Sequence, residues 1–185
     1  MDLPALSAPP RAEVSLAEAL RPGYCQRWSV YPELAGSEQH AAHAARVARI
    51  LIWCWPDAPA AVLIWAVLHD DGEMGFGDVA GPAKLDNPTL ALMLDKAEAR
   101  NLAKLGVTLP PLPAPSQLVC DFADKLAALY HIRQVRRDEL DGAKCRADLA
   151  VMHRRFNGIL AQRSAPIARL RADFEAAFAP WLEAV

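Results

Sequence analysis

The chain has 185 residues, enough for one domain with a substantial hydrophobic core, and 53% of its residues are hydrophobic. Twenty Lys and Arg residues against 22 Asp and Glu residues give a net charge of -2. This balance argues against a nucleic-acid groove and against attraction to an anionic membrane, so we expect neither partner.

The cysteine pattern and the N-terminal stretch both bear on the compartment. The four cysteines are spread along the chain without a C-x-x-C pair, which predicts neither a zinc knuckle nor a disulfide framework. The stretch MDLPALSAPPRAEVS has no basic flank and no continuous apolar segment, which is untypical of a secretory signal. We therefore expect reduced thiols and a cytoplasmic protein.

Helical spacing of apolar residues runs through almost the whole chain, and the alternating pattern of half-buried strands is not evident. We expect an all-α fold, a compact helical bundle that forms a single domain over residues 1–185. Ser15 and Glu18 form a capping-box pattern at the first expected helix, and the next helix is expected to begin near Ser37.

The most apolar stretch, residues 50–68, is split by Pro56, Asp57 and Pro59. It predicts two core helices that meet at a turn, with Asp57 as the cap of the second, rather than a membrane span. The tryptophans in these apolar segments are expected in the core: Trp53, Trp55 and Trp65.

Proline and glycine residues mark the expected helix boundaries and a loop in the next part of the chain. Asn87 followed by Pro88 marks a helix start, and Gly106 lies where that helix should end. Four prolines within residues 107–115 predict a connecting loop, after which Ser116 is expected to cap a long helix.

The last part of the chain is expected to form two more helices, within residues 142–182, that pack on the preceding ones. The basic segment at 131–138 has neighbours of both signs, which favours a solvated helix face. The apolar ending APWLEAV is expected to serve a homo-oligomer.

One cluster of residues has the chemical groups of a metal-binding site. The segment WAVLHDDGEMGFGD at 65–78 passes from an apolar helix into His69, Asp70 and further acids. Imidazole and carboxylate groups together suit a divalent ion. His40, near the start of an expected helix, and Asp124, inside an apolar helical segment where a buried carboxylate needs a partner, are candidates to complete the site.

The ordered set of His40, His69-Asp70 and Asp124 resembles the H…HD…D signature of the HD-domain metal-dependent phosphohydrolases. Within them it is most similar to the bacterial 5′-deoxynucleotidases and the short phage-type dATP triphosphohydrolases, over residues 23–130. Their Arg-Trp pair is matched by Arg27 and Trp28. Their HD-x-x-E…GD…P-x-K stretch is matched by His69, Asp70, Glu73, Gly77, Asp78, Pro82 and Lys84.

The resemblance implies a role for each matched residue. The implied ligands of a divalent ion (Zn, Co, Mn or Mg, with room for a second ion) are His40, His69, Asp70 and Asp124. Glu73 and Asp78 would position or deprotonate the attacking water, or hold a second ion. The implied substrate contacts are Arg27 and Lys84 to phosphate, and Trp28 and Val30 to the sugar and base.

Two positions depart from the family's pattern. SEQH stands where relatives have SEH or AEH, and His43 lies one helical turn beyond His40. The helical register favours His40 as the ligand, but an exchange with His43 stays open. Relatives mostly carry a small residue at the position of Asp71, so its role is open.

The resemblance implies hydrolysis of a small-molecule 2′-deoxynucleotide. RWSV, which places Val30 two residues beyond Trp28, is similar to the phage-type enzymes and favours a triphosphohydrolase that releases triphosphate from dATP. The alternatives are a 5′-deoxynucleotidase acting on dNMPs and a non-catalytic nucleotide-binding module. The additional histidines of cyclic-nucleotide hydrolases do not follow the HD pair.

Overall fold

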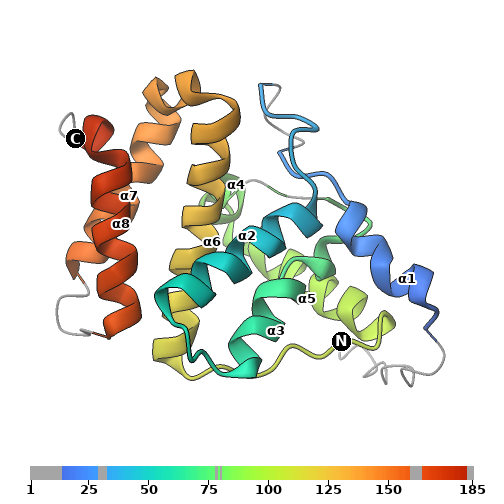
Figure 1. The fold of residues 1–185 in the computed structure, drawn as a ribbon. Helices are drawn as coiled ribbons and strands as arrows, with labels where there is room; N and C mark the ends of the chain where they lie inside the picture. Colours follow the sequence, from blue (N-terminus) through green and yellow to red (C-terminus); the bar gives the residue numbers. More distant parts are fainter. Residues whose placement is uncertain (1–13, 29–32, 78, 80, 159–163, 183–185) are drawn as a thin grey trace. The chain divides into compact units, whose positions relative to one another are not determined.

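The computed structural model describes residues 14–28, 33–77, 79, 81–158 and 164–182, and its regular elements are all helices (Figure 1). These ranges contain no strand, and their one isolated β-bridge joins Gln26 and Gln39. The all-α prediction is therefore confirmed. Within the same ranges, no helix combines the length and apolar character that crossing a membrane requires.

Two compact units make up the chain. Unit 1 comprises Met1–Ala45 and Val67–Pro110, and unit 2 comprises Arg46–Ala66 and Pro111–Val185. The elements that lie wholly in unit 1 are α1 (Leu16–Leu20), η2 (Arg21–Tyr24), η3 (Asp71–Glu73), α4 (Gly81–Asp86) and α5 (Pro88–Lys104). Those of unit 2 are α6 (Ala114–Val135), η4 (Arg137–Asp141), α7 (Ala143–Gly158) and α8 (Ala165–Leu182). Both units share α2 (His40–Cys54) and α3 (Ala60–Leu68). The single domain over residues 1–185 stays a prediction.

Two helix starts in unit 1 follow their predicted capping residues. The Ser15 Oγ accepts a hydrogen bond from the Glu18 N–H at 3.2 Å, and the Ser15 N–H donates to the Glu18 carboxylate at 2.8 Å. The Asn87 side chain accepts from the Leu90 N–H at 3.0 Å, with Pro88 as the first helical residue. This helix, α5, ends at Lys104, and Gly106 then adopts a positive φ of 64°.

Helix α2 begins later than predicted, at His40 rather than near Ser37. The Ser37 N–H closes a turn onto the Leu34 carbonyl at 3.0 Å. The next residues pair with the chain before them, since the Arg27 N–H donates to the Glu38 carbonyl and the His40 N–H to the Cys25 carbonyl, both at 2.9 Å. Because of this extended pairing, α2 begins only at His40, and the segment that contains Arg27 is joined to the start of α2.

Two further capping predictions are wrong. Helix α6 begins at Ala114, so Ser116 lies inside its first turn rather than at its cap. Prolines are tolerated in a first helical turn because the N–H groups there have no helical partner, so Pro115 enters the helix. Pro59, and not Asp57, directly precedes α3, and its carbonyl accepts from the Val62 N–H at 2.9 Å.

An aromatic cluster forms the core of unit 2. Phe122 of α6 stacks on Phe156 of α7 with ring centroids 4.0 Å apart. Phe156 contacts Phe174 of α8 at 5.4 Å, and Phe174 contacts Phe178 at 5.5 Å. All four rings are buried. These contacts pack α6, α7 and α8 together within unit 2.

The tryptophans differ in their environments. Trp181 is buried, and its indole N–H donates to the Asp141 carboxylate at 3.0 Å. Trp53 is 54% exposed, so its predicted place in the core is wrong. On α2 it lies between exposed Ile52 and buried Cys54, where the apolar composition of the segment could not show which face each residue takes. The predicted homo-oligomer stays a prediction.

Candidate metal centre

The turn after α3 is held closely against α5. The Asn101 side-chain amide donates to the carbonyls of Gly72 and Met74, at 2.9 and 2.7 Å. A Cβ atom added to Gly72 would lie 2.8 Å from the Glu98 Cβ and 2.9 Å from the Glu98 carbonyl oxygen. Only glycine permits this approach, so Gly72 and Asn101 fix the turn that carries Asp70 and Glu73.

We expect Gly72→Ala to destabilise the protein by about 1 to 3 kcal/mol, because the new methyl group overlaps backbone atoms of α5 that cannot move aside cheaply. Gly158→Ala is the control, since a Cβ there meets nothing within 4 Å. Urea denaturation of both variants measures the difference. Equal stability of Gly72→Ala and Gly158→Ala would show that the turn is not held as described.

Two histidines flank one carboxylate in unit 1. The Nε2 atom of His69, the residue after α3, lies 3.3 Å from the Asp70 Oδ1. The Nε2 atom of His43, on α2, lies 3.7 Å from the Asp70 Oδ2. The two imidazole rings have centroids 5.6 Å apart, and a ring nitrogen of each lies within 4.8 Å of the other. His43 is fully buried, and the His69 side chain is 8% exposed.

Arg27 also contacts this carboxylate. Its guanidinium forms an ion pair with Asp70 and lies 3.6 Å from the Glu38 carboxylate. Glu38 also accepts a hydrogen bond from the Trp28 indole N–H at 3.0 Å. Trp28 has a positive φ of 63°, which is uncommon for a bulky residue. Its contacts with Arg27 and Glu38 hold the backbone in this conformation.

Glu73 lies at a second, adjacent polar cluster. Its carboxylate is buried, 3.5 Å from the His40 Nε2 and 3.7 Å from the Lys84 Nζ. Lys84 also donates a hydrogen bond to Glu98 at 3.3 Å. Burial lowers the pKa of Lys84, but the Glu98 and Glu73 carboxylates outweigh burial and hold that pKa above its ordinary value. Lys84 is therefore a fixed cation beside Glu73.

The carboxyl group of Asp71 is perturbed by burial and by a neighbouring like charge. Burial, reinforced by the adjacent Asp70 carboxylate, raises the pKa of the Asp71 carboxyl to about 6. Like charges on consecutive carboxylates and partial burial both penalise the ionised form. A cation bound beside Asp70 would relieve this penalty, so the acidic turn is electrostatically suited to a positive ion.

The predicted site residues lie in different parts of the chain. Unit 1 brings together six of them: Arg27, Trp28, His69, Asp70, Glu73 and Lys84. His40 also belongs to unit 1, where it lies beside Glu73, and its role as a ligand stays a prediction. Val30 and Asp78 lie outside the described residues. Asp124 lies on α6, in unit 2.

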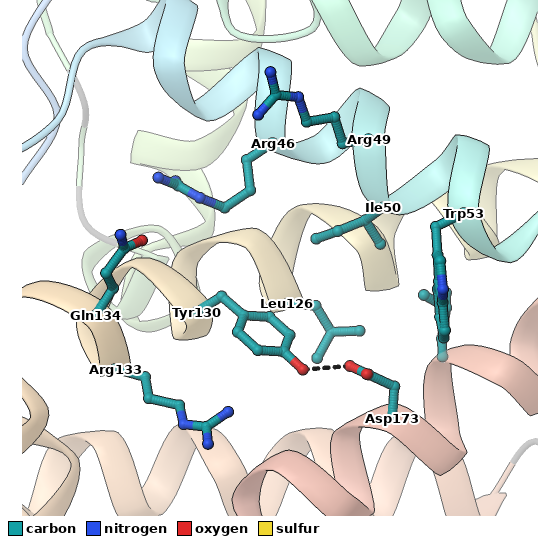
Figure 2. A pocket seen from close by; sticks show the side chains of 10 residues that line it. Arg46, Arg49, Ile50, Trp53, Leu126, Tyr130, Arg133, Gln134 and Asp173 are labelled. Atoms are coloured by element: carbon teal, nitrogen blue, oxygen red, sulfur yellow. Dashed lines mark hydrogen bonds between the residues drawn. The ribbon is translucent and has the colours of Figure 1, made fainter.

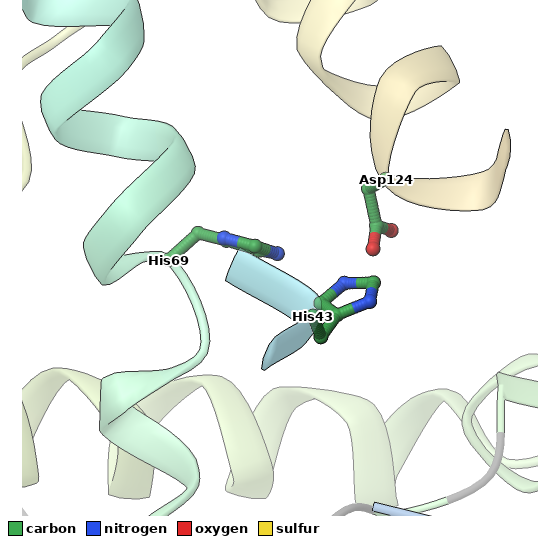
Figure 3. A group of neighbouring side chains, drawn as sticks. All are labelled: His43, His69 and Asp124. Atoms are coloured by element: carbon green, nitrogen blue, oxygen red, sulfur yellow. The ribbon is translucent and has the colours of Figure 1, made fainter. Parts of the chain in front are cut away.

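The described residues include a group that could hold a metal ion, and His43 and His69 are its members from unit 1. Figure 3 draws these two histidines together with Asp124. Imidazole nitrogens with carboxylate oxygens form a donor set that suits zinc, cobalt or manganese. The donor chemistry therefore fits the predicted divalent cofactor.

Sequence reasoning did not identify three supporting residues: Glu38, Glu98 and Asn101. Glu38 stands two positions before His40 in a segment already singled out, so its nearness to a candidate ligand was an available signal. Glu98 and Asn101 are ordinary polar residues of a helix, and no local pattern marks their contacts with the turn.

Comparisons of the chain with family models, with curated proteins and with solved structures find no match.

Proposed function

We propose that this protein is a divalent-metal-dependent phosphohydrolase that acts on 2′-deoxynucleotides. The observation that carries the proposal is the placement of the His43 and His69 imidazoles on either side of the Asp70 carboxylate in unit 1. His43 lies 26 positions before His69 in the chain, and buried groups of this chemistry commonly converge to hold an ion. The resemblance to HD-domain phosphohydrolases supports the same assignment.

The proposed ligands are His43, His69, Asp70 and Asp124, with zinc, cobalt, manganese or magnesium as the ion. His43 takes the place first given to His40, because its Nε2 lies beside Asp70 whereas the His40 Nε2 lies beside Glu73. Asp124 is included because the resemblance implies it as a ligand and because a carboxylate can bind a divalent ion. Arg27 forms an ion pair with the Asp70 carboxylate and would fix its orientation.

A divalent ion bound here would acidify a water molecule and neutralise phosphate charge. Glu73 would accept the proton of the attacking water, because it is buried and lies in the same turn as Asp70, whose carbonyl accepts a hydrogen bond from the Glu73 N–H at 3.0 Å. Lys84, held in its charged form 3.7 Å from Glu73, would stabilise the negative charge that develops on the leaving phosphate.

Glu73→Gln should lower the turnover number by about 10² to 10⁴ while metal content stays unchanged, because the amide cannot accept the proton. Glu98→Gln is the matched control: it removes a carboxylate beside the same lysine, and we expect less than about a tenfold effect. Steady-state kinetics and elemental analysis measure both properties. A Glu73→Gln variant with wild-type turnover would remove Glu73 from the chemistry.

The proposed substrate is a deoxynucleoside triphosphate of the dATP type, hydrolysed to deoxynucleoside and triphosphate. This choice rests on the similarity of the Arg27-Trp28 segment to the phage-type enzymes. Hydrolysis of dNMPs by the same groups is the alternative, since both reactions need a metal-activated water, a proton acceptor and cations for phosphate.

Chromatographic product analysis tests the proposal. The protein is incubated with each dNMP and dNTP in separate magnesium, manganese, cobalt and zinc buffers, with excess EDTA as the control. Deoxyadenosine plus intact triphosphate from dATP would support the proposed reaction. Deoxynucleoside plus single phosphate from dNMPs alone would replace it with the nucleotidase reaction. No metal-dependent turnover of either set would refute the enzyme and favour a binding module.

A further inference from the structure

A pocket of about 620 Å³ lies within unit 2, and its residues play no part in the proposed hydrolysis (Figure 2). Its walls come from α2, α6 and α8. The volume falls inside the range of about 300 to 1,000 Å³ that is typical of small-molecule sites. The pocket is therefore large enough for a compact organic ligand.

The polar lining of this pocket is predominantly cationic. Arg46 and Arg49 enter from α2 and Arg133 from α6, whereas Asp173 is the one carboxylate that lines it. Figure 2 shows the guanidinium groups of Arg46 and Arg133 on either side of the Tyr130 ring in this view. Guanidinium groups bind phosphate and carboxylate through paired, charge-assisted hydrogen bonds, so the lining selects an anion.

The single carboxylate is already engaged within the pocket. The Tyr130 hydroxyl donates a hydrogen bond to Asp173. Burial, and then the hydrogen bond to this carboxylate, raise the pKa of Tyr130 above its ordinary value, so the hydroxyl stays protonated and keeps donating. One oxygen of Asp173 is therefore occupied by Tyr130, and the three arginines of the lining outnumber this one carboxylate.

The remaining wall is apolar and includes an aromatic face. Ile50, Leu126 and Leu170 line the pocket beside Trp53, a residue that is 54% exposed. An exposed indole presents a flat surface on which a planar ring can stack. The segment at 131–138, expected only to form a solvated face, supplies one of the cations through Arg133.

We propose that this pocket binds a planar aromatic ring that carries a phosphate group. The ring would lie against Trp53 and the aliphatic side chains, and the phosphate oxygens would accept hydrogen bonds from Arg49 and Arg133. The site is separate from the proposed metal centre in its residues and in its chemistry, because it offers arginines and an indole rather than imidazoles.

The test uses phenylphosphonate, whose P–C bond resists hydrolysis, so turnover elsewhere on the protein cannot consume it. The full chain is labelled with ¹⁵N, and the Trp53 indole resonance, assigned by its loss in Trp53→Phe, reports on the pocket. We expect a saturable shift with a Kd on the order of 0.1 to 1 mM. Inorganic phosphate, which lacks the ring, should bind at least about tenfold more weakly.

The double variant Arg49→Gln/Arg133→Gln should raise the Kd for phenylphosphonate by at least about tenfold. Its control, Arg146→Gln/Arg171→Gln, removes the same charge from arginines outside the pocket and should leave the Kd unchanged. His69→Ala should also bind normally, which separates this site from the metal centre. An unshifted Trp53 indole at about 10 mM ligand, equal loss in both double variants, or equal affinity for inorganic phosphate would overturn the proposal.

Discussion

Replacing His69 by alanine is expected to remove metal-dependent hydrolysis of deoxynucleotides, with a loss of at least about a thousandfold in kcat/KM. The imidazole lies 3.3 Å from Asp70 and is one of two histidines that flank this carboxylate. Without it the proposed ion loses a ligand, and the attacking water is no longer acidified. Elemental analysis of the purified variant should show reduced metal content alongside the lost turnover.

His153→Ala is the control for this change. His153 lies on α7 in unit 2, where its ring lies 3.3 Å from the Asn157 amide, far along the chain from the proposed ligands. We expect wild-type turnover and metal content for it. Circular dichroism should show that both variants keep their helices, because His69 follows the end of α3 rather than supporting its core. Wild-type activity in His69→Ala would contradict the assignment of this ligand.

Phe174→Ala is expected to cost about 3 to 5 kcal/mol of unfolding free energy, the largest effect on stability that we predict. The Phe174 ring is fully buried between Phe156 and Phe178, at centroid distances of 5.4 and 5.5 Å. Its removal leaves a cavity at the centre of the cluster that packs α6, α7 and α8. Urea denaturation followed by circular dichroism measures the loss.

Phe76→Ala makes the same chemical change at a position that is 37% exposed, in unit 1. We expect it to cost less than about 1 kcal/mol, because little apolar surface is lost and no enclosed cavity forms. Similar midpoints and slopes for the two variants would mean that the aromatic cluster does not hold unit 2 together.

The helical class was predictable from the sequence because the apolar spacing recurs over long segments. Helix ends were predictable where one side chain alone decides them. Asn87 caps α5 through its own hydrogen bond to the Leu90 N–H. The start of α2 was not predictable, since it depends on the pairing of residues 38–40 with a segment that precedes them.

The candidate site was predictable in part for a similar reason. His69, Asp70 and Glu73 are close in the chain, so one local motif identifies them together. The ion pair between Arg27 and Asp70 joins residues 43 positions apart, and only the folded chain shows it. The hydrogen bond from Asn101 to the Gly72 carbonyl joins residues 29 positions apart, and no local sequence pattern marks it.

The choice between His40 and His43 shows the limit of helical register. Both residues lie on one face of α2, and both are buried, at 1% and 0% exposure. Their surroundings differ instead: His40 faces Glu73, and His43 faces Asp70. This difference arises from tertiary contacts with the turn after α3, so it cannot be predicted from the spacing of the two histidines along α2.

These two histidines give the most direct test of the central claim, that a divalent ion binds beside Asp70. Metal-stripped wild type, His43→Ala and His40→Ala are titrated with Mn²⁺ or Co²⁺ by isothermal titration calorimetry. We predict saturable binding by wild type and by His40→Ala, and at least about tenfold weaker binding by His43→Ala. No saturable binding by wild type, or weakening by His40→Ala while His43→Ala binds normally, would contradict the proposed centre.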